Sequence, residues 1–195
     1  LAEARAMLEE QAKLEEQAPV LRPRAHRETL LLLSLILAYQ GEAEAALHTA
    51  VAGTKRGQEL NSQFITAVGH FRQGHAWLLH KNEPGYEQAR RCYQQGLALS
   101  EQLEVPRLKI EAFWGLCQAH GFPGDHQTAL TYAQEGIALA RLHGDEWVEM
   151  NIRLAMGATY TLMGMAQEAN EWLAQAAAGF HDCSDTFGET AVRLW

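Results

Sequence analysis

The chain has 195 residues, of which 47% are apolar, and a formal net charge of −8. This acidic balance argues against nucleic acid as a direct partner, because phosphate binding needs clustered lysine and arginine. The longest apolar run covers nine residues, 30–38, and includes Ser34. A membrane-spanning helix needs roughly 20 residues, so no membrane partner is expected.

The three cysteines, Cys92, Cys117 and Cys183, are widely spaced and form no C-x-x-C pair. An odd number in this arrangement indicates neither a disulfide framework nor a zinc site. The N-terminal sequence also lacks the positive-then-apolar layout of an export signal. We therefore expect a reducing, cytoplasmic setting.

The helical pattern begins in residues 1–17, where apolar residues recur at helical spacing. Pro19 and Pro23 interrupt it before a second predicted helix at 24–40, and Gly41 supplies the next turn. Further helices are predicted over 42–60, 63–80, 86–103, 107–120, 126–143, 146–163 and 166–180, with a last one from about Thr186. No alternating strand pattern of useful length occurs, so the predicted fold class is all-α.

Basic residues gather at one place only, just before the second predicted helix. We interpret this cluster as a solvated first turn or linker, with DNA contact as the less favoured alternative. Its members are Arg22, Arg24, His26 and Arg27.

Two connections carry clear turn signals. The segment 81–85, KNEPG, contains Pro84 and Gly85 and is predicted to be a loop. The segment 121–125, GFPGD, ends on Asp125, which can cap the following helix. Gly164 is expected to join the last full helix pair.

Small residues recur at nearly constant intervals along the chain. Near the start of alternate helices, alanines are spaced at intervals of about 40 positions, a period typical of helical repeats: Ala46, Ala89, Ala129 and Ala169. Equal spacing of this kind marks a solenoid of stacked helix pairs. The predicted organisation is one domain with a leading helix at 1–17, repeats over about 24–60, 63–103, 107–143 and 146–180, and a truncated helix at 186–195. Because 187–195 aligns with 147–155, we expect a fragment of a larger protein.

The fourth repeat resembles the tetratricopeptide repeat (TPR), whose pattern is small, aromatic, glycine, small, bulky, small. The matching residues are Gly157, Tyr160, Gly164, Ala169, Leu173 and Ala176. In the other repeats Ser34, Gly74 and Gly115 are assigned to the small position, and Leu37, Trp77 and Gln118 to the aromatic one. The resemblance implies a right-handed superhelix of antiparallel helix pairs, here with about 40 residues per repeat.

The long repeat period looks most like that of the MalT-like TPR region of large bacterial transcriptional regulators of the LuxR and SARP types. In that family the superhelix lies between a nucleotide-binding switch module and a DNA-binding module, and receives an inducer or a regulatory protein. The resemblance thus implies transcription regulation and signalling as the biological setting.

A ligand would meet the first helices of the repeats, which such solenoids present on their concave side. Counting from the assigned small positions places five residues on a candidate groove: Glu28, Phe71, His75, Lys109 and Asn151. This mostly apolar surface suits a peptide, a partner helix or a small organic inducer. For Phe71 the alternative is a core position between neighbouring helices.

No catalytic, cofactor-binding or metal-binding residues are predicted. His70, His75 and His80 recur every five residues, which spreads them around a helix and away from a common ion. No nucleophile lies in an elbow or beside a base, and no phosphate-binding loop is present. We therefore expect a binding protein and not an enzyme.

The leading hypothesis is a ligand- or partner-binding sensor region of a bacterial multidomain transcriptional regulator. Its partner would be a protein or peptide, with a small-molecule inducer as an additional option. The alternative is a constitutive protein–protein interaction scaffold without a small-molecule ligand. Self-association through the C-terminal end is a further hypothesis, since that helix lacks its pair.

Overall fold

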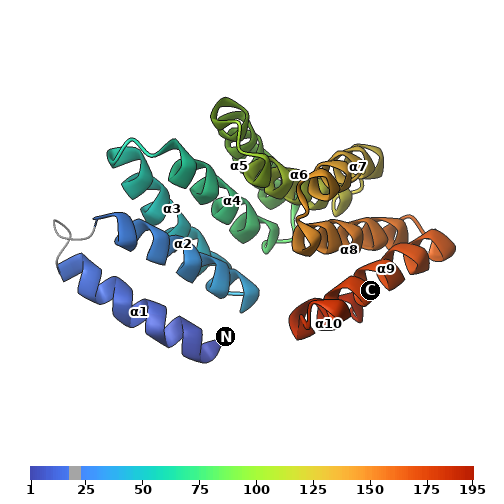
Figure 1. The fold of residues 1–195 in the computed structure, drawn as a ribbon, viewed down its shortest axis with the longest axis horizontal. Helices are drawn as coiled ribbons and strands as arrows, with labels where there is room; N and C mark the ends of the chain where they lie inside the picture. Colours follow the sequence, from blue (N-terminus) through green and yellow to red (C-terminus); the bar gives the residue numbers. More distant parts are fainter. Residues whose placement is uncertain (18–22) are drawn as a thin grey trace. The chain divides into compact units, whose positions relative to one another are not determined.

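The structure is a computed structural model that describes residues 1–17 and 23–195, with the backbone alone for 23–27. Within these residues all regular structure is α-helical (Figure 1), which confirms the all-α prediction. The helices are α1 Ala2–Gln17, α2 Pro23–Tyr39, α3 Ala43–Glu59, α4 Gln63–Leu78, α5 Glu83–Leu103, α6 Pro106–Gly121, α7 His126–His143, α8 Glu146–Leu162, α9 Ala166–Asp182 and α10 Thr186–Val192. The side chains of the basic cluster at 22–27 lie outside the described residues, so their role stays a prediction.

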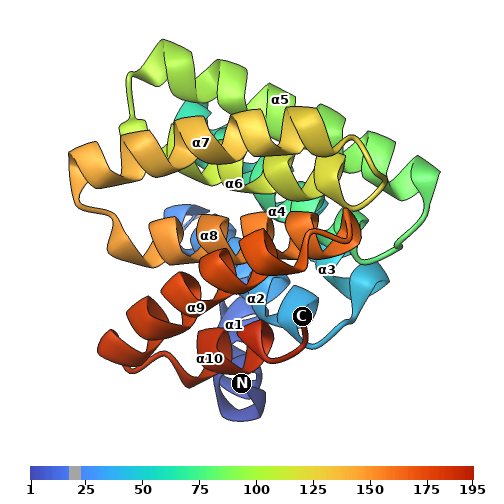
Figure 2. The same cartoon turned by 90° about the vertical axis from the view of Figure 1, so that its right-hand side faces the viewer.

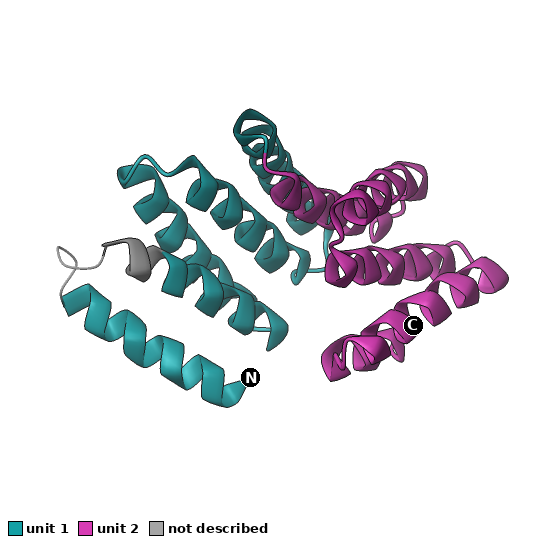
Figure 3. Ribbon diagram, viewed as in Figure 1, with its two compact units in different colours: residues 1–104 teal, residues 105–195 magenta. Residues whose placement is uncertain are grey.

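The helices form two compact units, Leu1–Glu104 and Val105–Trp195 (Figure 3). In the first unit α2 packs with α3 and α4 with α5, while α1 covers α2. In the second unit α6 packs with α7, α8 with α9, and α10 lies against α9 (Figure 2). Within each unit the first helices of successive pairs also contact each other. That the chain is a single domain stays a prediction.

Close approach of paired helices explains the small residues of the repeat. The four anchor alanines are buried, with exposed fractions of 0% for Ala46, Ala89 and Ala129 and 4% for Ala169. A side chain at Gly96 would clash with the ring of Phe71, and one at Gly136 would meet Ile152 at 2.8 Å. The periodic small residues therefore allow one helix to pack directly against the next.

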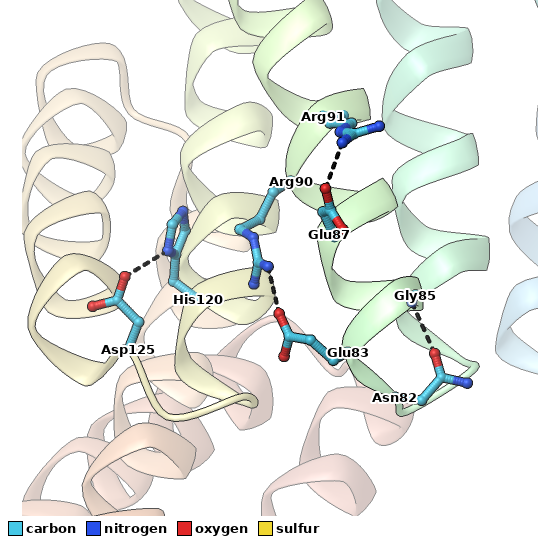
Figure 4. Close-up of polar contacts among 8 residues, drawn as sticks. All are labelled: Asn82, Glu83, Gly85, Glu87, Arg90, Arg91, His120 and Asp125. Atoms are coloured by element: carbon cyan, nitrogen blue, oxygen red, sulfur yellow. Dashed lines mark hydrogen bonds and ion pairs between the residues drawn. The ribbon is translucent and has the colours of Figure 1, made fainter.

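The predicted loop at 81–85 is wrong at its end, because α5 already begins at Glu83. Asn82 caps this helix, its Oδ1 accepting a hydrogen bond from the Gly85 amide at 2.8 Å (Figure 4). Pro84 occupies the first turn, where a residue without an N–H loses no helical hydrogen bond. Proline and glycine occur both in loops and in the first turn of a helix, so composition alone could not show that a helix begins here.

Other predicted turns agree with the structure. Gly41 and Gly164 have φ angles of 80° and 74°, a left-handed conformation that glycine adopts at little cost. Asp125 caps α7 as predicted, with its Oδ1 accepting from the Thr128 amide at 3.4 Å. Short turns of this kind fix the angle at which each helix returns along its partner.

Two of the three cysteines lie in the core. Cys92 and Cys117 are buried and Cys183 is exposed, with all three as free thiols. Burial raises the pKa of Cys92 to about 11 and the pKa of Cys117 to about 12. The buried thiols are thus protonated at neutral pH, and thiolate is the form that reacts.

We expect a soluble thiol reagent at pH 8 to modify Cys183 within minutes and the other two cysteines only on unfolding. Mass spectrometry of the native chain over time counts the modified thiols. The chain unfolded in urea, in which all three thiols react, serves as the reference. Rapid native labelling of Cys117 would contradict its buried position.

A histidine and a carboxylate meet at the start of α7. The Nδ1 of His120 lies 2.9 Å from the Oδ2 of Asp125 (Figure 4), and its ring packs against Tyr132 at 5.6 Å. Burial acts to raise the pKa of Asp125, but hydrogen bonds from His120 and Thr128 outweigh it and lower that pKa. The charged carboxylate is therefore favoured in the folded state.

This lowered pKa predicts an acid-sensitive contribution to stability. The pKa of an aspartate in an unfolded chain is about 3.9. The stabilisation is present above that value and is lost as the pH falls through the lower folded pKa. We expect the urea midpoint of the wild-type chain to exceed that of Asp125→Asn at pH 6, with the difference shrinking toward pH 3. A difference that is constant with pH would contradict the assignment.

Candidate functional site

Three of the five predicted groove residues belong to the first unit. Glu28 on α2 is exposed, and His75 on α4 is partly buried with its ring edge-on to Tyr93 at 5.6 Å. Phe71 has an exposed fraction of 0% and stacks on Tyr93, with ring centroids 6.3 Å apart. Its burial fits the core alternative and corrects the assignment of Phe71 to the groove surface.

The other two predicted residues belong to the second unit. Lys109 on α6 is partly buried, with its ammonium 5.8 Å from the ring centre of Phe113. Asn151 on α8 donates its side-chain amide to the carbonyl of Trp147 in the preceding turn, at 2.9 Å. Its amide nitrogen is therefore already used within the helix.

The structure corrects the register of the third repeat. Helices α6 and α8 begin at Pro106 and Glu146, and counting from these starts makes Gly157 equivalent to Cys117 and not to Gly115. Consistent with this, Cys117 is fully buried in a core cluster with Ala133. In the same count Ala133 is equivalent to Leu173, the residue against which Gly157 packs.

Two assignments change with this register. The aromatic position of the third repeat is filled by His120, whose ring packs against Tyr132, and not by Gln118. Lys109 becomes equivalent to Glu149 in the next repeat, since both follow the first residue of their helix by three. The corrected register therefore relates the predicted groove residue Lys109 to Glu149, a position that was not among the predicted site residues.

Glu149 lines a cleft of about 420 Å³ between α8 and α9, which is our candidate functional site. Each helix contributes residues at i, i+3, i+4 and i+7, the spacing of one helical face. The lining residues are Glu146, Glu149, Met150, Arg153, Gln175, Ala178, Gly179, Asp182 and Cys183. The helices can approach closely because Gly179 has no side chain. A Cβ at this position would clash with the sulfur of Met150.

An ion-paired cluster forms one wall of the cleft. Glu149, only 6% exposed, accepts hydrogen bonds through its Oε1 from Arg141 Nε at 2.7 Å and from Arg153 Nη2. Charge-assisted hydrogen bonds of this kind are among the stronger polar contacts in proteins. The buried carboxylate is therefore neutralised from two sides, and Arg153 is held in place by it.

The first turn of α8 is fixed by a device that recurs one repeat later. Asp145 caps α8 through its Oδ1, which accepts from the Val148 amide at 3.3 Å, while its Oδ2 pairs with Arg107 Nε at 2.8 Å. At the equivalent place in the next repeat, Asp185 caps α10 and its Oδ2 accepts from Trp147 Nε1 at 2.9 Å. Each capping aspartate therefore ties its own helix to the first helix of the preceding pair.

A smaller cleft of about 350 Å³ lies in the first unit beside the α3–α4 turn. The described residues that line it are uncharged, five with amide or hydroxyl side chains and one aliphatic: Gln58, Asn61, Ser62, Gln63, Thr66 and Leu99. It lacks the buried ion pairs that order the α8–α9 cleft, so we regard it as the weaker candidate.

Two properties of the described residues bear on function. No group of three or more histidine, cysteine, aspartate or glutamate side chains there is arranged to hold a metal ion. Among the same residues, every helix is too short or too polar to cross a lipid bilayer.

The fold and its paired helices define a protein class, that of TPR-like helical repeats. A solved structure of this kind, the crystal structure of a Rap protein complexed with competence and sporulation factor, superimposes with a TM-score of 0.68 and 15% identity. The match covers 97% of this chain and 56% of the Rap chain, so the chain spans little more than half of that protein. No family model and no curated protein matches the sequence. The likeness confirms the predicted TPR-like repeat fold.

Proposed function

We propose that this chain is a partner-binding helical-repeat region that receives a protein or peptide in the α8–α9 cleft. The observation that carries the proposal is the cleft itself, about 420 Å³ with a charged wall built on a buried ion-paired glutamate. Rigid helix faces with fixed polar groups suit recognition of a folded segment or a peptide. That a Rap protein of the same fold is complexed with a factor supports a binding role.

Binding and not catalysis is the proposed activity. The raised pKa values of Cys92 and Cys117, about 11 and about 12, argue against either thiol as a nucleophile at neutral pH. Three free thiols, one of them exposed, support a reducing cytoplasmic setting for the protein.

We further propose that the region acts as the sensor of a bacterial multidomain transcriptional regulator of the MalT-like kind. The support is the long repeat period of the second unit. This period is the spacing between the first residues of α6 and α8, Pro106 and Glu146. In such a protein, partner binding would bias the parent between two states through differential affinity. Flanking gene sequence encoding a phosphate-binding loop and a helix-turn-helix would support this, and further repeats alone would favour a constitutive scaffold.

The binding role is tested by display selection. Random twelve-residue peptides displayed on phage are panned against the immobilised chain, with a urea-unfolded sample as the control surface. We expect enriched sequences that bind the folded chain and raise its melting temperature. Failure of repeated selections to enrich any peptide for the folded chain would overturn the peptide-binding proposal.

A further inference from the structure

Two carboxylates of the α8–α9 cleft belong to exposed residues, Glu146 and Asp182. Glu146 begins α8 and Asp182 ends α9, and both line the cleft. Within the described part of the chain, neither carboxylate takes part in an ion pair or a side-chain hydrogen bond, whereas the neighbouring Glu149 is paired twice. The cleft therefore presents two negative charges that are available to a ligand.

The position of Asp182 adds to the preference of the cleft for a cationic ligand. Backbone dipoles place partial negative charge at the C-terminal end of a helix, where cations are stabilising and carboxylates are not. Asp182 is the last residue of α9, whose final turn contains only His181 as a basic residue. That histidine is engaged by Glu189 at 3.0 Å. A cation entering the cleft would thus meet a carboxylate and a helix C-terminus together.

Arg153, the basic residue among the described lining of the cleft, does not offset this preference. Arg153 donates to Glu149, so its positive charge is committed within the protein. Its Nε is nevertheless a buried donor without an acceptor among the described residues. An anionic ligand would therefore have to compete with Glu149 for Arg153, and the buried Nε offers no accessible donor in its place.

The remaining lining residues are compatible with an aliphatic stem. Met150, Ala178 and Gly179 supply the apolar part of the lining, about one helical turn from Glu146 and Asp182. Lysine and arginine side chains bury such stems along apolar surface while the charged head reaches polar groups. A cleft of about 420 Å³ also exceeds the size of one side chain and leaves room for adjoining peptide backbone.

We propose that the α8–α9 cleft recognises a lysine or arginine side chain of a peptide segment, with Glu146 and Asp182 as the two anionic contacts. This inference rests on the proposed function, because it names the chemistry of the partner received at the same site. It makes the partner basic, in agreement with the net charge of −8 of the chain.

The test uses the same peptide selection on three forms of the full chain. One is wild type, one carries Glu146→Gln and Asp182→Asn, and the matched control carries Glu16→Gln and Glu135→Gln, two exposed carboxylates outside the cleft. We expect lysine or arginine at one fixed position among the enriched peptides. Fluorescence anisotropy with a labelled selected peptide should then show affinity about tenfold weaker for the cleft variant and within about twofold for the control.

The outcomes separate the two proposals. Enriched peptides without a basic residue, or basic peptides whose affinity falls equally in the control variant, would overturn the cationic cleft and leave peptide binding intact. An absence of any enrichment would overturn the proposed function itself. Circular dichroism of each variant confirms that the isosteric changes leave the helices folded.

Discussion

Replacement of Phe71 by alanine is expected to lower the free energy of unfolding by about 3–5 kcal/mol, the range for truncating a fully buried aromatic residue. The ring has no exposed surface, stacks on Tyr93 at a centroid distance of 6.3 Å, and fills the space that Gly96 leaves open. Its removal both loses transfer free energy and leaves a cavity between α4 and α5. The measurement is urea denaturation followed by circular dichroism.

The matched control lies on the same helix. Phe64 is 45% exposed, so Phe64→Ala should cost much less, on the order of 1 kcal/mol or below. If Phe71→Ala fails to fold, Phe71→Leu keeps most of the volume and should show a smaller loss in the same direction. Unchanged stability of Phe71→Ala, together with loss of peptide binding, would restore Phe71 to the groove.

The repeat architecture could be predicted from the sequence because close helix packing requires small residues at fixed intervals. Ala46, Ala89, Ala129 and Ala169 are all buried at the helix contacts that their spacing implied. Any bulky residue at these positions would separate the paired helices, so the periodicity persists while the rest of each repeat varies. The fold therefore leaves a regular pattern in the sequence.

Register within a repeat is harder to predict than the period. Glycine is the smallest residue, which favours Gly115 as the third small position, yet the helix starts place Cys117 there. A buried thiol behaves as a small hydrophobic group, so cysteine serves the same packing role. A shift of two residues changes the direction of a side chain around the helix axis by more than half a revolution. Lys109 is therefore equivalent to Glu149 in the next repeat, and not to Asn151 as the sequence count predicted.

The candidate cleft itself leaves no pattern of this kind. Its character depends on which carboxylates are paired: Glu149 is engaged by two arginines, while Glu146 and Asp182 have no such partner among the described residues. In the sequence all three are acidic residues near helix ends. Pairing is a property of the folded side chains, and it separates the structural glutamate from the two that can meet a ligand.

Truncation of Glu149 to alanine is expected to destabilise the chain by about 3 kcal/mol, because removing one member of a buried ion pair leaves the other charge without compensation. Glu149 is 6% exposed and accepts from both Arg141 and Arg153. The nearby Glu146→Ala is the control, since that carboxylate has no partner among the described residues and should contribute less than about 1 kcal/mol. Equal effects of the two changes in urea denaturation would contradict the assigned pairing.

A double variant separates the interaction from the cost of the buried charge. In Glu149→Leu with Arg153→Met, both charged groups are replaced by apolar side chains, and such replacements are often neutral or stabilising when the volume is kept. We expect this variant to recover most of the stability lost in Glu149→Leu alone, giving a coupling free energy of about 1–3 kcal/mol in the double-mutant cycle. If the stability losses of the two single variants simply add in the double variant, the two side chains do not interact and Glu149 does not hold Arg153 in place. In that case Arg153 would be free to bind an anion, and the preference of the α8–α9 cleft for a basic side chain would fail with it.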